Sequence, residues 1–168
     1  MPNEAEIDLF VEKFVIDTAK ETLQKHEDVM PCFFTFGDVA GAGEVCVMPI
    51  DADLSKPDVK NEIIATLKQL KKEKPFHTAV FVSDAHFKAY EGMSSQEAMA
   101  ERQKFDARLS EDPDSKEAIV VARITARGGS TIMVEHKELD DGTISFEKPS
   151  KQAGIHSSWM TRIWEDVN

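Results

Sequence analysis

Three residues that can do chemistry end one of the most apolar segments of the chain. The stretch HTAVFVSDAHF, residues 77–87, finishes with Ser83, Asp84 and His86, which are the residue types of a catalytic triad. Successive side chains of a β-strand point to opposite faces, so Asp84 and His86 share one face while Ser83 lies on the other. The spacing therefore excludes a triad and leaves Asp84 with His86 as a two-residue catalytic candidate.

Metal binding is the second chemistry that the sequence allows. The candidate ligands in or beside the expected strands are His77, Asp84, His86, Glu135 and His136. His136 joins Asp84 and His86 if its strand lies next to theirs. Zinc sites show three or four ligands at recognisable spacings, but the sequence contains no CxxC, HxH or HxxxH pattern. We therefore interpret these residues as polar side chains at strand ends and predict no metal or other cofactor.

Two further motifs have structural explanations that are simpler than a catalytic or ligand-binding role. Cys32 and Cys46 stand in apolar runs, where burial raises the pKa of a thiol and makes it unreactive. We expect both to be buried and reduced, although the sequence does not decide whether they are paired.

The glycine-rich stretch at 37–43 continues into Glu44 rather than Gly-Lys-Ser/Thr, and a strand-like run follows it. It predicts a hairpin turn and not a phosphate-binding loop.

Composition limits the classes of partner. The chain has 168 residues and a net charge of −11, with 41% hydrophobic and 30% charged residues. This length suits a single domain over residues 1–168 with a core of its own. The excess of carboxylates argues against binding to nucleic acid or to an anionic membrane surface. The start lacks the features of a secretory signal and no apolar run approaches the roughly 20 residues of a membrane span, so we expect a cytoplasmic protein.

Periodicity and turn residues predict the elements that position these side chains. Helical spacing of apolar residues occurs in segments at about 4–26, 55–74 and 157–167. Strands are expected at 30–37, 44–50, 76–87, 117–126, 131–138 and 143–147, with turns at Gly128-Gly129 and Asp141-Gly142. Ser55 is expected to cap the second helix. Residues 88–116 form a long insertion with a short helix from about Ser95, where Ser94 and Glu97 predict a capping box, and residues 148–157 are expected to be a flexible join. The order α-β-β-α-β-(insert)-β-β-β-α predicts an α+β fold, in which helices pack on a mainly antiparallel sheet of five or six strands.

The first and last helices each carry one apolar stripe. In the first helix the expected stripe consists of Ile7, Phe10, Val11, Phe14, Val15 and Thr18, with Asn3 as the cap. In the amphipathic C-terminal helix, Trp159, Ile163 and Trp164 share one face. We expect this face to pack on the chain's own sheet, and binding to a protein partner or a second subunit is the alternative.

Two segments together resemble a family of small uncharacterised bacterial proteins. They are AVFVSDAHF at 79–87 and SEDPDSKEAIVV at 110–121, although His86 stands where that family has a tryptophan. The resemblance covers about a quarter of the chain and implies a compact cytoplasmic domain, with no activity to carry over. The order of elements is also similar to that of roadblock/profilin-like regulatory domains, which is a likeness of topology and does not define a function.

No single motif decides the function. We predict a non-enzymatic binding or regulatory protein, which could act as a homodimer. One alternative is a small hydrolase or metal-dependent enzyme that uses Asp84, His86 and a neighbouring side chain. Another is an acidic inhibitor or immunity-type protein that covers a basic partner. The enzyme alternative requires the polar side chains to converge in one pocket, and the inhibitor alternative requires clustered carboxylates.

Overall fold

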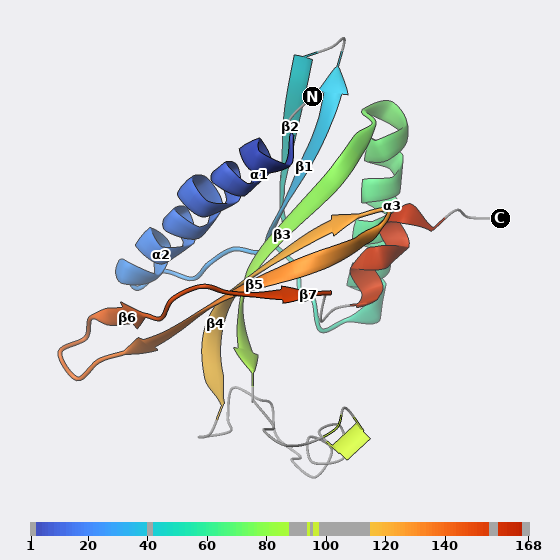
Figure 1. Ribbon diagram of the computed structural model, residues 1–168. Coiled ribbons are helices and arrows are strands. Elements are labelled where there is room, and N and C mark those ends of the chain that lie inside the picture. The colour runs from blue at the N-terminus through green and yellow to red at the C-terminus, as the bar shows by residue number, and fades with distance from the viewer. Residues whose placement is uncertain are drawn as a thin grey trace.

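Antiparallel pairing of neighbouring strands builds one twisted sheet. The computed structural model describes residues 3–39, 42–87, 94, 96–97, 115–154 and 158–165. The strands are β1 (Cys32–Val39), β2 (Ala42–Pro49), β3 (Phe76–Phe87), β4 (Lys116–Thr125), β5 (Gly128–Glu138), β6 (Ile144–Phe146) and β7 (Ser150–Ala153). They lie in the order β2-β1-β3-β4-β5-β6, and β7 also pairs with β5 (Figure 1). Every pairing is antiparallel, so the predicted α+β class is confirmed.

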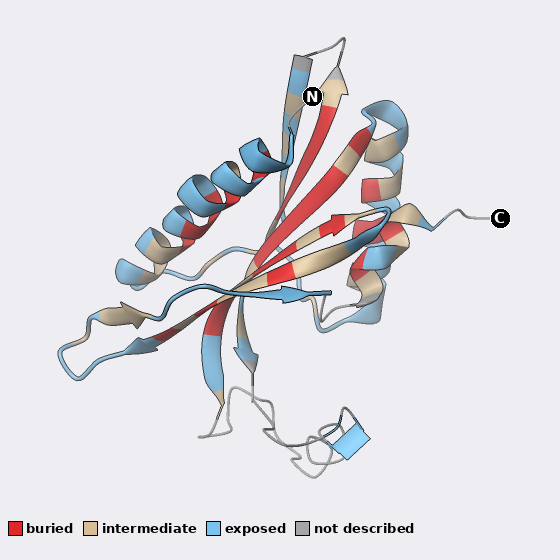
Figure 2. Ribbon diagram, viewed as in Figure 1, coloured by how far each residue is buried: buried red, intermediate tan, exposed pale blue. Residues whose placement is uncertain are grey.

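Helices cover both faces of this sheet. On one face α1 (Glu4–Phe10), the π-helical segment η1 (Val11–Ile16) and α2 (Asp17–Gln24) form one continuous helix; on the other lie α3 (Pro57–Glu73) and the 3-10 helix η3 (Ser158–Trp164) (Figure 1). A buried apolar cluster fills the space between the sheet and each helical layer (Figure 2). Val80 and Val82 belong to the first cluster and Ala79 and Phe81 to the second, as the alternation of β3 requires.

The first helix buries a different stripe from the one predicted. Asn3 caps it through a complete capping box with Glu6, as expected. The buried side chains are those of Ile7, Val11, Val15, Ile16 and Ala19. Thr18 is exposed, so the prediction that it lies on the buried stripe is wrong. Phe14 packs on the rings of Phe10 and Phe34 but stays 51% exposed, so it is not buried as predicted. The reason is η1, because π-helical i→i+5 bonds widen the turn and rotate the residues that follow.

The start of α3 also differs from the prediction. Ser55 is not the cap, because its hydroxyl donates to Asp53 Oδ1 at 2.6 Å and Lys56 occupies the cap position without a side-chain hydrogen bond. Pro57 is the first helical residue, where its fixed φ and missing N–H cost nothing. The helix then buries Ile63, Ile64 and Leu67 against the sheet.

A close approach of two strands fixes a glycine at position 37. The register between β1 and β3 shifts at Phe36/Gly37, which is a β-bulge. A Cβ atom on Gly37 would lie 2.1 Å from the carbonyl oxygen of Pro75. Only glycine fits this position. Strand β1 continues through Gly37 to Val39, whereas the sequence suggested that it ends at Gly37.

The C-terminal segment packs on the chain's own sheet. Met160 and Ile163 are buried, and the Trp159 ring packs edge-on against the rings of Phe33 and Phe81. The segment is a short 3-10 helix, so the prediction of an α-helix over 157–167 is wrong in type and length. Strand β7 lies within 148–157, where we expected a flexible join, and it brings the sheet to seven strands.

The predicted insertion lies almost wholly outside the described residues. Between β3 and Ser115 the structure describes only Ser94, Gln96 and Glu97. The backbone N–H of Glu97 donates to Ser94 Oγ at 3.2 Å, which is half of the capping box expected there. None of the helices in the described part of the chain is both long enough and apolar enough to cross a membrane.

Candidate functional site

Three adjacent strands change from apolar to polar at the same end of the sheet. On the face covered by the first helix, β3 runs Val80, Val82, Asp84, and β5 carries His136 two residues beyond Val134. The register places His86 opposite Glu117 of β4, and Glu117 opposite His136. The first helix stops at Gln24, so these polar side chains occupy the part of the face beyond its end. Strand pairing therefore brings together residues that are far apart in sequence.

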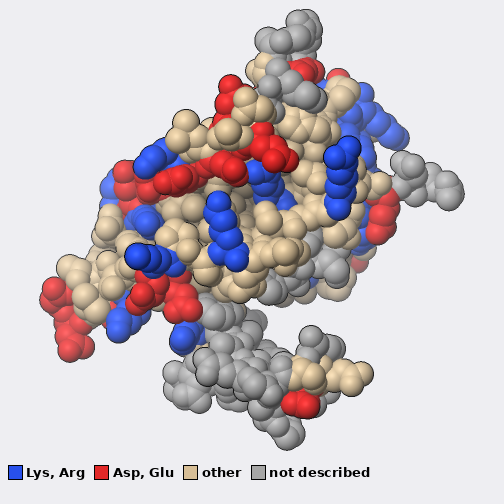
Figure 3. Space-filling model, viewed as in Figure 1, with Lys and Arg blue, Asp and Glu red and all other residues tan. Residues whose placement is uncertain are grey.

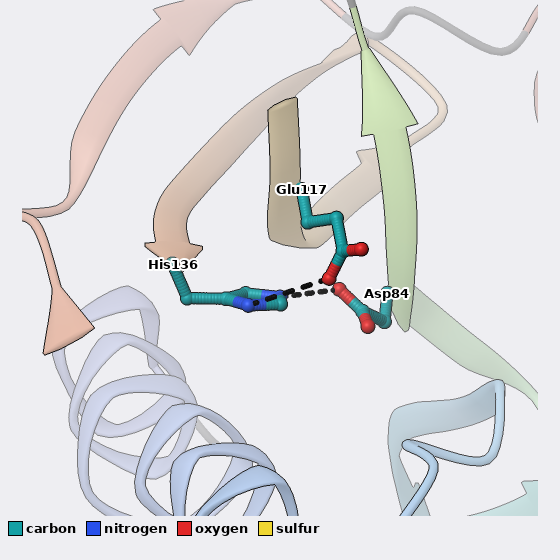
Figure 4. Close-up of side chains that lie close together, drawn as sticks. All are labelled: Asp84, Glu117 and His136. Atoms are coloured by element: carbon teal, nitrogen blue, oxygen red, sulfur yellow. Dashed lines mark hydrogen bonds and ion pairs between the residues drawn. The ribbon is translucent and has the colours of Figure 1, made fainter. Parts of the chain in front are cut away.

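A buried histidine faces two carboxylates at this end, and the two carboxylates approach each other on one side of its ring (Figure 4). The Nε2 atom of His136 lies 2.7 Å from Asp84 Oδ1, and its Nδ1 atom lies 3.7 Å from Glu117 Oε2. The His136 side chain is 3% exposed, whereas that of Asp84 is 26% exposed and that of Glu117 is 47% exposed. Glu117 also approaches His86, with 3.7 Å between Oε1 and Nε2. Both ring nitrogens of His136 thus face negative charge.

The two carboxylates favour the charged form of His136. The hydrogen bond to Asp84 raises the pKa of His136 above its ordinary value, burial opposes this rise, and the charges of Asp84 and Glu117 add to it. In the imidazolium form, Nε2–H donates to Asp84 Oδ1 and Nδ1–H faces Glu117. Protonation of His136 would therefore compete with metal binding, because a ring nitrogen must lose its proton to act as a ligand.

The cluster opens into a pocket of about 680 Å³. Carboxylates dominate the lining: Glu27, Asp28, Asp84, Glu117, Glu135, Glu138 and Glu147. The lining also includes His136, Lys116 and Lys137. Figure 3 shows acidic side chains around the free ends of β5 and β6, with lysines among them. The pocket presents clustered carboxylates, so it suits a positively charged ligand better than an anion.

The structure brings together some of the predicted site residues and separates others. Asp84 and His136 meet directly, whereas His86 contacts Glu117 and does not line the pocket. Glu135 lies 3.8 Å from Lys116. His77 lies at the opposite end of β3 from Asp84, where its Nδ1 atom is 2.8 Å from Thr78 Oγ1.

Sequence reasoning missed Glu117, the residue that links the two histidines. Two interactions reveal its role: the ion pairs with His86 and with His136. The β4–β5 hairpin could have revealed this residue. If the turn is placed correctly, with Thr125 opposite Gly128, the antiparallel register pairs Glu117 with His136.

The remaining sequence candidates are structural or stay untested. Both cysteines are free, and burial raises the pKa of the Cys32 thiol, as expected. Both residues are only partly buried, so the prediction that both are buried is wrong. Ile163 is fully buried and Trp164 packs edge-on against Phe76, while a role of Trp159, Ile163 and Trp164 in partner binding stays a prediction.

Comparison of the chain with protein-family models, curated proteins and solved structures found no match. The likeness to the uncharacterised bacterial family and to roadblock/profilin-like domains therefore also stays a prediction.

Proposed function

We propose that the protein binds a divalent metal cation at Asp84, Glu117 and His136. The observation that carries this proposal is their convergence from three strands, with one ligand atom from each residue within 4.8 Å of the others. Imidazole with carboxylate is a donor set that suits zinc and neighbouring transition metals. The proposal departs from the sequence prediction of no metal, which relied on local spacing and did not include Glu117.

The arrangement favours an open site over a closed structural one. Structural zinc sites take four protein ligands, whereas sites that exchange ligands keep three and leave one position free. Here three residues supply ligand atoms, and the pocket lies on their open side. His86 approaches the second oxygen of Glu117, so it can orient that carboxylate. A cation held here would present its free position to whatever enters the pocket.

Direct titration with Zn²⁺ tests the proposal. Isothermal titration calorimetry of the full chain should show one site per chain, and Co²⁺ should give the visible absorption of a low-symmetry site. Glu117→Gln should weaken Zn²⁺ binding by at least about tenfold. Glu135→Gln is the matched control, because it removes the same charge from the same pocket but its carboxylate lies beside Lys116.

Two outcomes would contradict the proposal. The first is that Zn²⁺ shows no saturable binding to the protein at any concentration tested. Alternatively, Glu117→Gln and Glu135→Gln could weaken binding equally, which would mean that the pocket only attracts cations through its overall charge.

Hydrolysis at the same site is the second candidate function, favoured by the open position. A bound cation lowers the pKa of a coordinated water and so supplies a nucleophile near neutral pH. The measurement is Zn²⁺-dependent cleavage of simple phosphate and carboxylate esters, with Glu117→Gln as the inactive comparison. Binding without turnover would favour the non-enzymatic role that the sequence suggested.

A further inference from the structure

The edge strand β2 has an exposed apolar face. Val45 is 41% exposed and Val47 is 58% exposed, and both lie on the face that carries the first helix, opposite Phe36 and Phe34 of β1. Among the described residues, only β1 pairs with β2, so one whole edge of β2 offers unpaired backbone groups. The strand has eight residues and is therefore roughly 26 Å long.

This edge lacks the features that usually protect a sheet edge. Exposed edges normally carry lysines, inward-pointing charges, prolines or bulges that prevent pairing with another chain. The charged residue of β2 is Glu44, and Lys74 already holds its carboxylate at 2.8 Å. Pro49 stands only at the end of the strand. An edge of this kind is open to pairing with a strand of another chain.

The first helix extends the apolar surface. The Phe14 ring is 51% exposed and packs at 5.0 Å from Phe10 and 6.2 Å from Phe34, the residue opposite Val47. Phe14 therefore lies on the side of the helix that faces β1 and β2, because Phe10 and Phe14 both contact rings of β1. Val45, Val47 and Phe14 form what we call the β2 strip.

We propose that a second copy of this chain covers the β2 strip, with the two β2 strands paired antiparallel about a two-fold axis. Antiparallel pairing of a strand with its own copy satisfies the free backbone groups on both chains and closes the assembly at two subunits. It also keeps both first helices on one face, so the two Phe14 rings extend the same apolar surface.

The residues of β2 favour one register, with the axis at Cys46. This register pairs the stretch from Gly43 to Pro49 along its whole length. It places Val45 opposite the partner's Val47, and it places Glu44 opposite the partner's Met48, so no like charges face each other. It also places Cys46 opposite the partner's Cys46, with Cα atoms about 4.5–5.5 Å apart. That spacing lies within the range that a disulfide spans.

Size and crosslinking measurements test the proposal on the full chain. Sedimentation equilibrium should give twice the chain mass of 18.8 kDa at micromolar concentration. Copper phenanthroline, which oxidises two thiols to a disulfide, should convert the protein to a covalent dimer. Cys46→Ser should abolish that dimer, and Cys32→Ser should leave it intact, because Cys32 lies on β1 and the opposite face of the sheet from Cys46.

A charge on the strip should separate the subunits. Val47→Lys should weaken the dimer by about a hundredfold, since both copies lose a buried valine. Leu139→Lys is the control, because Leu139 is also exposed and apolar, at 41%, but follows β5 far from β2 in the sheet order. A monomer at all concentrations, a crosslink that depends on Cys32, or equal effects of the two lysine variants would overturn the proposal.

Discussion

Replacing Asp84 with asparagine tests whether the contact between His136 and Asp84 is a charged pair. The His136 side chain is 3% exposed, so its imidazolium depends on the carboxylate 2.7 Å away. Asparagine keeps an acceptor oxygen of similar size but removes the charge. A hydrogen bond to a charged group contributes about 1.5–3 kcal/mol and a neutral one about 1 kcal/mol. We therefore expect Asp84→Asn to lower the free energy of unfolding by about 1–2 kcal/mol when His136 is charged.

The loss of stability depends on pH with a definite sign. The Asp84 hydrogen bond raises the pKa of His136 in the folded protein, whereas an unfolded histidine has a pKa of about 6.5. A raised pKa in the folded state stabilises the protein fully below the unfolded pKa, and this contribution disappears as the pH rises through the folded pKa. Asp84→Asn should therefore cost most at pH 5.5 and least at pH 9.

Urea denaturation of both proteins at these two pH values measures the effect. Each free energy of unfolding comes from linear extrapolation, and unchanged m-values show that the unfolded states are comparable. Glu147→Gln is the control, because Glu147 is an exposed carboxylate that lines the same pocket, and it should change stability by no more than about 0.5 kcal/mol. An equal loss for Asp84→Asn at pH 5.5 and pH 9 would refute the charged pair.

Two further substitutions test the packing that supports the sheet. Gly37→Ala should lower the free energy of unfolding by about 3 kcal/mol or more in urea, because its Cβ would lie 2.1 Å from the Pro75 carbonyl oxygen; wild-type stability would show that the β-bulge rearranges freely. Phe33→Ala should cost about 3–5 kcal/mol and change the fluorescence of Trp159, since the fully buried Phe33 ring packs against that indole. Leu9→Ala, at a site 59% exposed, is the comparison for Phe33→Ala and should have little effect on either measurement.

Strand patterns could be read from the sequence because they are local. The alternation in residues 77–87 correctly placed Asp84 and His86 on one face, since β3 continues regularly to Phe87. The turn residues likewise predicted the antiparallel run of β4, β5 and β6. In the first helix, Val15 is buried as predicted but Thr18 is exposed, because a π-helical segment leaves no simple signature in the spacing of apolar residues.

The site itself depended on register, which the sequence determined less well. A turn centred on Gly128-Gly129 would pair Glu117 with Asp140 and hide its relation to His136. In the structure the turn residues are Ala126 and Arg127, and Thr125 pairs with Gly128. This shift brings Glu117 opposite His136. One misplaced turn was enough to remove a residue from the predicted cluster, because each register assigns every cross-strand pair at once.

The relation between helix length and strand length explains why the polar cluster lies where it does. The helix over residues 4–24 is roughly 31 Å long, whereas the twelve residues of β3 span roughly 40 Å. The sheet therefore extends past its helical cover, and side chains on this part of the face need not be apolar. The hydrogen bond to Asp84 offsets the cost of burying the polar ring of His136 there. The polar ending of β3 thus forms one wall of the acidic pocket that β4 and β5 also line.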